Sequence, residues 1–129
     1  MALKSYRPLT PPQRFKSLPA FEEITKWSPE KSLVEVKKRS GGRNNNGRMT
    51  ARHIGGGHKQ KYRKVDFKRR KRGVSAEVIG IEYDPNRSAR IALIKYTDGE
   101  LSYILAPDGL LVGSKVTAGD NVAPDLGNA

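Results

Sequence analysis

The stretch from Lys37 to Arg72 constrains this chain more than any other feature of the sequence. It contains fifteen Lys and Arg residues and a single acid, Asp66, so it carries +14. The whole chain carries +12, and the remaining residues together therefore carry −2. A segment so charged, rich in Gly and Asn, cannot bury enough apolar surface to fold alone. It requires a polyanion, and its residue types indicate structured RNA.

Length and composition limit the other possibilities. A chain of 129 residues accommodates one small domain with extensions. A net charge of +12 predicts binding to nucleic acid or to an anionic membrane surface. No apolar run of about eighteen residues and no apolar signal-peptide core occur, so nothing spans a bilayer, and of the two partners we expect RNA and no membrane. The absence of cysteine excludes disulfides and thiolate metal sites and fits a cytoplasmic location. His53 and His58 are the only imidazoles and no acid stands near them in sequence, so we expect no metal and no cofactor.

Residues 1–36 are predicted to form an irregular lead-in. Five prolines interrupt any helix in this segment because proline lacks the amide donor. Its apolar residues are scattered, and only residues 33–36 look extended. Such a segment is typical of a tail that orders on a partner.

Residues 37–60 form a basic loop rich in glycine. Gly41-Gly42 and the cluster from Gly55 to Gly57 allow close backbone approach and positive φ angles. The loop is not a P-loop, because the spacing and the Lys-Ser/Thr ending are missing. A flexible linker is the alternative, but self-repulsion among the cations argues against it.

Residues 61–118 are predicted to form a compact β-domain. The run from Tyr62 to Lys68 alternates partly and predicts a strand with an exposed basic side. β-branched runs at residues 74–83, 89–97, 100–106 and 114–117 predict four more, with Asp98-Gly99 as a two-residue hairpin turn. Five short strands predict a small barrel. The aliphatic residues expected to fill it are Val78, Ile79, Ile81, Ile91, Leu93, Ile94, Leu101, Ile104, Leu105, Leu111 and Val116.

Five runs resemble one family, the bacterial large-subunit ribosomal protein L-two family. They are Ser40–Arg48, Thr50–Gln60, Tyr62–Arg69, Glu82–Ala89 and Tyr103–Pro107, and the match extends from about Ser40 to Ala129. The resemblance implies an all-β fold: a five-stranded OB-type barrel preceded by a long irregular basic N-terminal extension. In the family a second, SH3-like barrel follows, so residues 119–129 are expected to begin the linker to a domain that this chain lacks.

The resemblance also implies a function. A member of the family is a structural constituent of the large ribosomal subunit, located in the cytoplasm, that binds 23S rRNA and supports subunit assembly. In the family this extends to subunit association and peptidyl-transferase function. Large-subunit rRNA is then the main partner, and neighbouring ribosomal proteins are further partners.

The residues expected to bind rRNA share a positive charge or a ring that stacks. The expected phosphate contacts are Arg43, Arg48, Arg52, Lys59, Lys61, Arg63, Lys64, Lys68, Arg69, Arg70, Lys71 and Arg72. His53, His58 and Tyr62 are expected to stack on unpaired bases or to bond to ribose hydroxyls, although a hydrogen-bonded loop role explains each histidine equally well. Arg87 lies on a turn between barrel strands, where OB folds present ligand contacts.

Two other classes of function are less consistent with the sequence. A free-standing OB-fold module for single-stranded RNA usually presents aromatic residues for stacking, and the barrel offers only Tyr83, Tyr96 and Tyr103. An enzyme needs a nucleophile with a base, or a placed acid and base, and no such pair is recognisable here. We therefore expect no catalytic residue and no small-molecule substrate.

Overall fold

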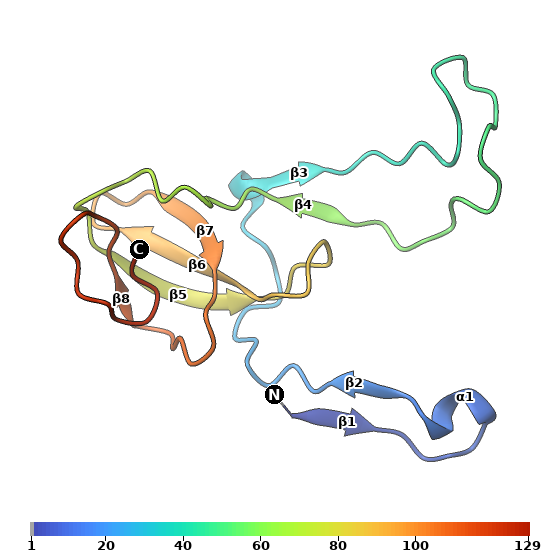
Figure 1. The fold of residues 1–129 in the computed structure, drawn as a ribbon, viewed down its shortest axis with the longest axis horizontal. Coiled ribbons are helices and arrows are strands. Elements are labelled where there is room, and N and C mark those ends of the chain that lie inside the picture. The colour runs from blue at the N-terminus through green and yellow to red at the C-terminus, as the bar shows by residue number, and fades with distance from the viewer. Residues whose placement is uncertain (1) are drawn as a thin grey trace.

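The computed structural model describes residues 2–129 and consists mostly of strands with little helix (Figure 1). In chain order the elements are β1 (Leu3–Ser5), α1 (Pro11–Arg14), β2 (Ser17–Pro19), the 3-10 turn η1 (Lys31–Leu33), β3 (Val34–Val36), β4 (Lys61–Arg63), β5 (Ala76–Glu82), β6 (Ile91–Tyr96), β7 (Leu101–Leu105) and β8 (Lys115–Val116).

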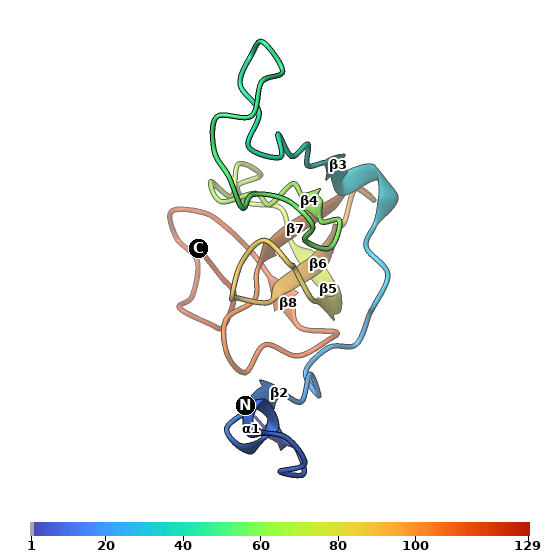
Figure 2. The same ribbon diagram turned by 90° about the vertical axis from the view of Figure 1, so that its right-hand side faces the viewer.

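Four strands form one antiparallel sheet in the order β7-β6-β5-β8. The sheet curls into a half-barrel (Figures 1 and 2). In β5 the pairing register shifts between Val78 and Gly80, so Ile79 is an extra residue in the strand. A bulge of this kind bends a strand and increases its twist, which favours the curl. Ile79 is 42% exposed and lies on the solvent side with Glu77, as alternation from the buried Ala76 and Val78 requires, against the expectation that it fills the core.

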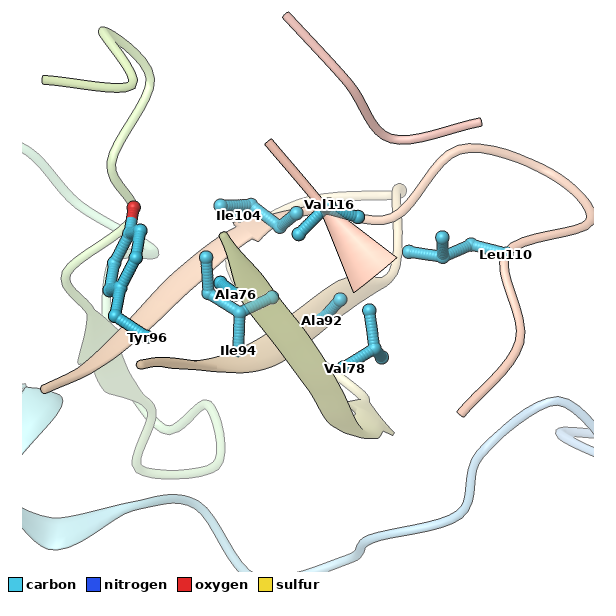
Figure 3. Packing of buried hydrophobic residues seen from close by; sticks show 8 residues of the cluster. All are labelled: Ala76, Val78, Ala92, Ile94, Tyr96, Ile104, Leu110 and Val116. Carbon is cyan, nitrogen blue, oxygen red and sulfur yellow. The ribbon is translucent and has the colours of Figure 1, made fainter. Parts of the chain in front are cut away.

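The main core lies on one face of the curled sheet. It comprises Ala76, Val78, Ala92, Ile94, Tyr96, Ile104, Leu110 and Val116 (Figure 3). Ile91, Leu93 and Tyr103 form a second cluster, against which Leu33 and Val65 pack. Because side chains alternate along a strand, the two clusters lie on opposite faces of β6. Leu105 and Leu111, both expected inside, are exposed.

The predicted strand from Tyr62 to Lys68 is much shorter in the structure. β4 is three residues long and pairs with β3, and an isolated bridge joins Val65 to Tyr103 of β7. Asp66 explains the difference, because its carboxylate accepts the backbone N–H groups of residues 68–70 and bends the chain. The main sheet therefore has four strands, and the expectation of five strands in one barrel is not confirmed.

The predicted two-residue turn at Asp98-Gly99 is also corrected. The Tyr96 N–H donates to the Glu100 carbonyl at 2.9 Å, so three residues, 97–99, form the loop between β6 and β7. Gly99 adopts φ +89°, the left-handed position of a three-residue hairpin loop.

The second half of the lead-in is fastened to β5. The N–H groups of Thr25 and Lys26 donate to the Ile81 carbonyl at 3.1 and 3.2 Å, and the Ile81 N–H donates to Thr25 Oγ1 at 2.9 Å. A side chain at Gly80 would crowd this contact, since a Cβ there would lie 3.3 Å from the Lys26 Cβ. The lead-in is therefore positioned by the sheet rather than by its own sequence.

A buried polar group also fixes the lead-in to the barrel. The Tyr103 hydroxyl donates to Glu82 Oε2 at 2.7 Å and accepts the Glu30 N–H at 2.8 Å. Burial raises the pKa of Glu82, although the Tyr103 hydrogen bond and the Lys26 ammonium 3.6 Å away oppose that rise. Burial likewise raises the pKa of the Tyr103 phenol, which keeps it a donor.

The first half of the lead-in forms a small hairpin, whereas an irregular segment is expected from its prolines. β1 and β2 pair antiparallel, with Leu3 opposite Pro19 and Ser5 opposite Ser17. The turn α1 begins at Pro11, where the missing proline N–H is tolerated. No residue from 2 to 23 is buried, and the hairpin stands away from the core (Figure 2).

Candidate RNA interface

The antiparallel ribbon of β3 and β4 carries residues 37–60, which we call the arm, away from the barrel (Figure 1). Val34 pairs with Arg63 and Val36 with Lys61, so the arm leaves and returns at adjacent positions. Apart from Gly42, no residue of the arm is buried. The conformation of the arm therefore depends on backbone geometry and hydrogen bonds rather than on a core.

Asn44 organises the outer loop of the arm. Its Oδ1 accepts the N–H groups of Asn46 and Arg48, both at 3.0 Å, and its own N–H donates to the Arg48 carbonyl at 2.9 Å. Gly47 adopts φ +74°, which closes the loop. The first asparagine of the Asn-Asn-Asn run is thus a structural residue, as asparagine often is in turns.

Gly42 closes the base of the same loop. Its carbonyl accepts the N–H groups of Thr50 at 2.9 Å and Ala51 at 3.1 Å. Its φ is +74°, and a Cβ at this position would lie 2.1 Å from the Ala51 carbonyl oxygen. Both the backbone angle and the close approach therefore require glycine.

The cations of the arm have no acids to neutralise them. Residues 37–65 contain no Asp or Glu, and within residues 2–129 no ion pair involves the arm or Lys61. The expected contacts on this segment are all exposed: Arg43, Arg48, Arg52, Lys59 and Lys61. Uncompensated charges of one sign create a positive potential that attracts a polyanion.

The three rings expected to stack are accessible. His53 is exposed with φ +60°, and Tyr62 on β4 is 38% exposed. His58 is exposed, and its Nδ1 lies 2.9 Å from the Lys59 carbonyl oxygen. Within the described part of the chain, no group of three or more metal-binding side chains occurs, and no helix is long and apolar enough to cross a membrane.

Asp66 shapes a second basic group directly after β4. Its carboxylate accepts the N–H groups of Lys68 at 3.2 Å, Arg69 at 3.1 Å and Arg70 at 3.3 Å. The resulting turn leaves Lys68 and Arg70 exposed. Arg69 adopts φ +48° and donates to the Gly127 carbonyl at 2.7 Å, so it faces the protein.

Three further cations expected to contact RNA form ion pairs at the surface. The pairs are Lys64–Glu35 (2.8 Å), Arg72–Asp120 (3.0 Å), and Lys71 with both Asp98 and Glu100. Hydrogen bonds to Asp98 and then Glu100 raise the pKa of Lys71. Exposed pairs of this kind contribute little to stability, so the cations can exchange an acid for a phosphate.

Arg63 does not occupy the exposed position that the sequence predicts. It is 7% exposed, and its Nη1 donates to the Lys61 carbonyl at 2.8 Å. Alternation along β4 leaves Tyr62 accessible and turns Arg63 inward, where its charge partly opposes the rise in the pKa of Glu82 that burial causes. The expectation that Arg63 lies on the exposed basic side is therefore corrected.

Arg87 is also occupied within the protein. Its Nε lies 2.6 Å from Asp84 Oδ2, and its guanidinium lies 5.3 Å from the centre of the Phe67 ring. Burial alone would raise the pKa of Asp84, but hydrogen bonds from Asn86 and Arg87 outweigh it and lower that pKa. Arg87 therefore holds the turn between β5 and β6, whatever else it contacts.

Three cations outside the predicted set of contacts belong to the same surface. Lys37 donates to Asn86 Oδ1 at 3.1 Å, while Lys38 and Arg39 are exposed. Arg39 passes so close to Gly57 that a Cβ there would lie 2.5 Å from Nη1. A hollow of about 430 Å³ lies between the outgoing part of the arm, residues 38–41, and its returning part, residues 54–57. The unbroken basic run that begins at Lys37 was the signal for all three.

An aromatic cluster lies where the lead-in meets the barrel. Phe21 packs edge-on against Trp27 and Tyr83, with ring centres 6.3 and 5.4 Å apart. The Arg90 guanidinium lies 5.0 Å from the centre of the Phe21 ring and pairs with Glu23. No local pattern predicts this cluster, because tertiary contacts bring its members together. Tyr96 and Tyr103, by contrast, are buried and cannot stack on a base.

Comparison with known proteins adds to this geometry. Residues 30–118 match the model of the RNA-binding N-terminal domain of ribosomal proteins L2. The large ribosomal subunit protein uL2 of Akkermansia muciniphila is 66% identical over 129 residues, which are 100% of this chain and 46% of the relative. The uL2 of Parabacteroides distasonis is 59% identical over 128 residues, covering 99% of this chain and 47% of the relative. The chain thus spans about half the length of the curated relatives it matches.

Proposed function

The chain belongs to the family of the large ribosomal subunit protein uL2, and we propose that it binds large-subunit (23S) rRNA as a structural constituent of that subunit. One observation carries this proposal: an arm without a core presents exposed cations that have no acid to pair with. Membership of a family of structural ribosomal proteins also confirms the expectation that the chain is not an enzyme.

In this proposal the arm enters the RNA and the barrel sets its direction. The phosphate contacts come first from Arg43, Arg48, Arg52, Lys59 and Lys61, because these residues are exposed and unpaired with acids. Lys68 and Arg70 extend the same surface to the turn after β4. Lys64, Lys71 and Arg72 join it by exchanging their acids for phosphates. His53, His58 and Tyr62 supply rings for unpaired bases or ribose hydroxyls.

The same charge neutralisation supports assembly of the subunit. RNA neutralises the arm and restricts its backbone, so the arm and the RNA that it contacts become ordered together. The barrel does not need this help, because its core is built from β5–β8. The protein thereby links a folded body to an RNA segment that it helps to hold in place.

An arm replacement tests the proposal. Val36 and Lys61 are directly paired, so an Asn-Gly dipeptide in place of residues 37–60 closes the ribbon with a tight hairpin turn. About six lost phosphate contacts should reduce the slope of log affinity against log salt by about 4, at roughly 0.7 per contact with single-stranded RNA. The measurement is a titration of 23S rRNA fragments at several salt concentrations. An unchanged slope would refute the proposal.

Two controls accompany this titration. A neutral Gly-Ser loop of the same length as residues 37–60 should bind as weakly as the Asn-Gly variant, which separates charge from the presence of a loop. Sedimentation with large subunits distinguishes the ribosomal role from the alternative of a free-standing OB-fold module. Such a module should bind unstructured homopolymer RNA equally well and should not sediment with subunits.

A further inference from the structure

The turn between β5 and β6, residues 83–90, lies next to the β3–β4 ribbon and contacts both ends of the arm (Figure 1). Asn86 makes the contact with its side-chain amide. Its Oδ1 accepts a hydrogen bond from the Lys37 ammonium at 3.1 Å, and its Nδ2 donates to the Lys61 carbonyl at 2.8 Å. Lys37 is the first residue of the arm, and Lys61 is the first residue after it. One amide therefore joins the points where the arm leaves and returns.

Two neighbouring hydrogen bonds reinforce the returning end of the arm. The Gln60 Nε2 donates to the Pro85 carbonyl at 3.1 Å, so the last residue of the arm is also attached to the turn. The Lys61 carbonyl accepts a second hydrogen bond, from Arg63 Nη1 at 2.8 Å, which its two lone pairs allow. The β5–β6 turn thus holds the arm at three residues that lie on both of its strands.

The turn itself is fixed from within the barrel by Asp84, which is fully buried. Its Oδ1 accepts the backbone N–H of Asn86 at 2.9 Å and the Asn86 Nδ2 at 2.8 Å, while its Oδ2 lies 2.6 Å from Arg87 Nε. These bonds hold the Asn86 amide in one orientation. Because β5 and β6 are the two middle strands of the main sheet, the arm is attached to the most rigid part of the molecule.

The ribbon by itself is a weak attachment for so long a loop. β3 and β4 pair over three residues each, and an isolated two-stranded ribbon is marginally stable in water. Apart from Gly42, no residue of the arm is buried, so no core restricts its direction. A loop that is already held in its bound geometry loses less conformational freedom on binding and therefore binds more tightly. The contacts made by the turn should consequently affect the affinity for RNA.

From this geometry we propose that the β5–β6 turn is a clamp on the two ends of the arm, and that Asn86 is a positioning residue that raises the affinity for RNA by holding the arm in one direction. The proposal rests on the function proposed above, because the arm is the element that binds RNA there. It assigns to an uncharged side chain of the barrel a role in binding that acts through the arm.

Spin labels test whether the turn holds the arm. The chain contains no cysteine, so Ser40→Cys in the arm and Lys95→Cys in β6, both at exposed positions, each give one attachment point for a nitroxide. In the RNA-free protein, pulsed EPR should show a broader distribution of the distance between the labels after Asn86→Ala. Lys37→Met frees only the outgoing end of the arm and should broaden the distribution less. Asn121→Ala is the matched control at an exposed asparagine, and it should leave the distribution unchanged.

RNA titration measures the consequence for binding. Asn86→Ala should weaken binding to 23S rRNA fragments about tenfold, with an unchanged slope of log affinity against log salt, because no cation is lost. Arg48→Gln removes an exposed cation of the arm and should instead reduce that slope by roughly 0.7. The variant with Asn-Gly in place of residues 37–60 has no arm to position. In that variant, Asn86→Ala should change the affinity by less than about twofold.

Three results would each overturn the proposal. Equal weakening by Asn86→Ala with and without the arm would mean that Asn86 does not act through the arm. An unchanged distance distribution would mean that the ribbon fixes the direction of the arm without the turn. A melting temperature lower by about 10 °C or more, with unchanged affinity for RNA, would mean that Asn86 only stabilises the barrel. All three results leave the proposed function intact, which fails if replacing the arm leaves the salt slope unchanged.

Discussion

Single acidic residues hold this basic chain in shape. Asp66, the one acid between Lys37 and Arg72, gathers three backbone N–H groups and so sets the turn that exposes Lys68 and Arg70. Glu82 is buried against Tyr103, and Asp84 is buried beneath Arg87. At this scale the acids position cations and backbone, and the unpaired cations are left for RNA.

Removal of one hydroxyl should weaken the attachment of the lead-in. Tyr103→Phe leaves Glu82 and the Glu30 N–H without their shared partner inside the protein, so we expect a loss of about 1–3 kcal/mol in the free energy of unfolding. Urea denaturation measures it. Tyr96→Phe is the control: this tyrosine is also buried, but its hydroxyl has no such bond. Equal losses in the two variants would show that the shared hydrogen bonds do not matter.

Asp84 should make stability depend on acidic pH. Its pKa is lowered in the folded state, so its ionised form stabilises the fold fully above the ordinary value of 3.8, and this contribution is lost as pH falls through the folded-state pKa. Asp84→Asn should therefore cost about 1–3 kcal/mol near pH 7. The difference between parent and variant should shrink below pH 3.8. Urea denaturation at both pH values measures this.

The exposed Asp108 serves as the control for that experiment. Asp108→Asn should leave the free energy of unfolding unchanged near pH 7, because no hydrogen bond or ion pair is lost. If the Asp84 variant were destabilised equally at every pH, the loss would come from packing rather than from charge.

At the scale of elements, the arm is a loop folded by its backbone. Asn44 and Gly42 close it through hydrogen bonds, and no side chain forms a core. A loop of this kind has a defined conformation where these hydrogen bonds close it, and its other residues change conformation easily. The affinity of the arm for RNA should therefore depend on the hydrogen bonds of Asn44 and Gly42. The stability of the barrel should not depend on them.

Two glycines with the same φ separate steric fit from backbone strain. Gly42→Ala would place a Cβ 2.1 Å from the Ala51 carbonyl oxygen, whereas nothing lies within 4 Å of a Cβ at Gly47, and both have φ +74°. Strain of about 1–3 kcal/mol is common to both variants, and only Gly42→Ala must also move the backbone. We expect Gly42→Ala to bind rRNA about tenfold more weakly than Gly47→Ala in a filter-binding titration. Equal affinities would mean that the base of the loop need not keep its shape.

At the scale of the whole molecule, stability and RNA binding reside in different residues. The core clusters draw on β5–β8 and their loops, with Leu33 and Val65 at the edge. The arm and the hairpin supply the uncompensated charge and no core residue. The molecule is thus a small folded body with two basic projections.

This division predicts that the barrel folds without the arm. The Asn-Gly replacement of residues 37–60 keeps the β3–β4 pairing and removes no core residue, so its melting temperature should stay within about 3 °C of the parent chain. Closing a shorter loop costs less entropy, which favours the replacement slightly. Circular dichroism during heating measures the melting temperature of the variant and of the parent chain. A melting temperature lower by about 10 °C or more would show that the arm supports the barrel.

Much of the fold can be predicted from local patterns. The β-branched runs between Val74 and Thr117 become β5–β8, because alternation and turn residues are local properties. The predicted strand from Tyr62 to Lys68 does not form over its full length. The carboxylate of Asp66 accepts the backbone N–H groups of residues 68–70, which a longer ladder would need. The hairpin at residues 2–20 is missed because its prolines sit at a strand end and in one helical turn, where they are tolerated.

For the candidate site, local sequence is enough to establish the need for a polyanion: fifteen cations among thirty-six residues with one acid cannot neutralise themselves or form a core. Which of those cations are free is a tertiary property. Strand alternation turns Arg63 inward, and Asp98 and Asp120 reach Lys71 and Arg72 through the folded chain. Ion pairing depends on distances in space, and for Lys71 and Arg72 those distances follow from strand pairing rather than from neighbouring residues in the sequence.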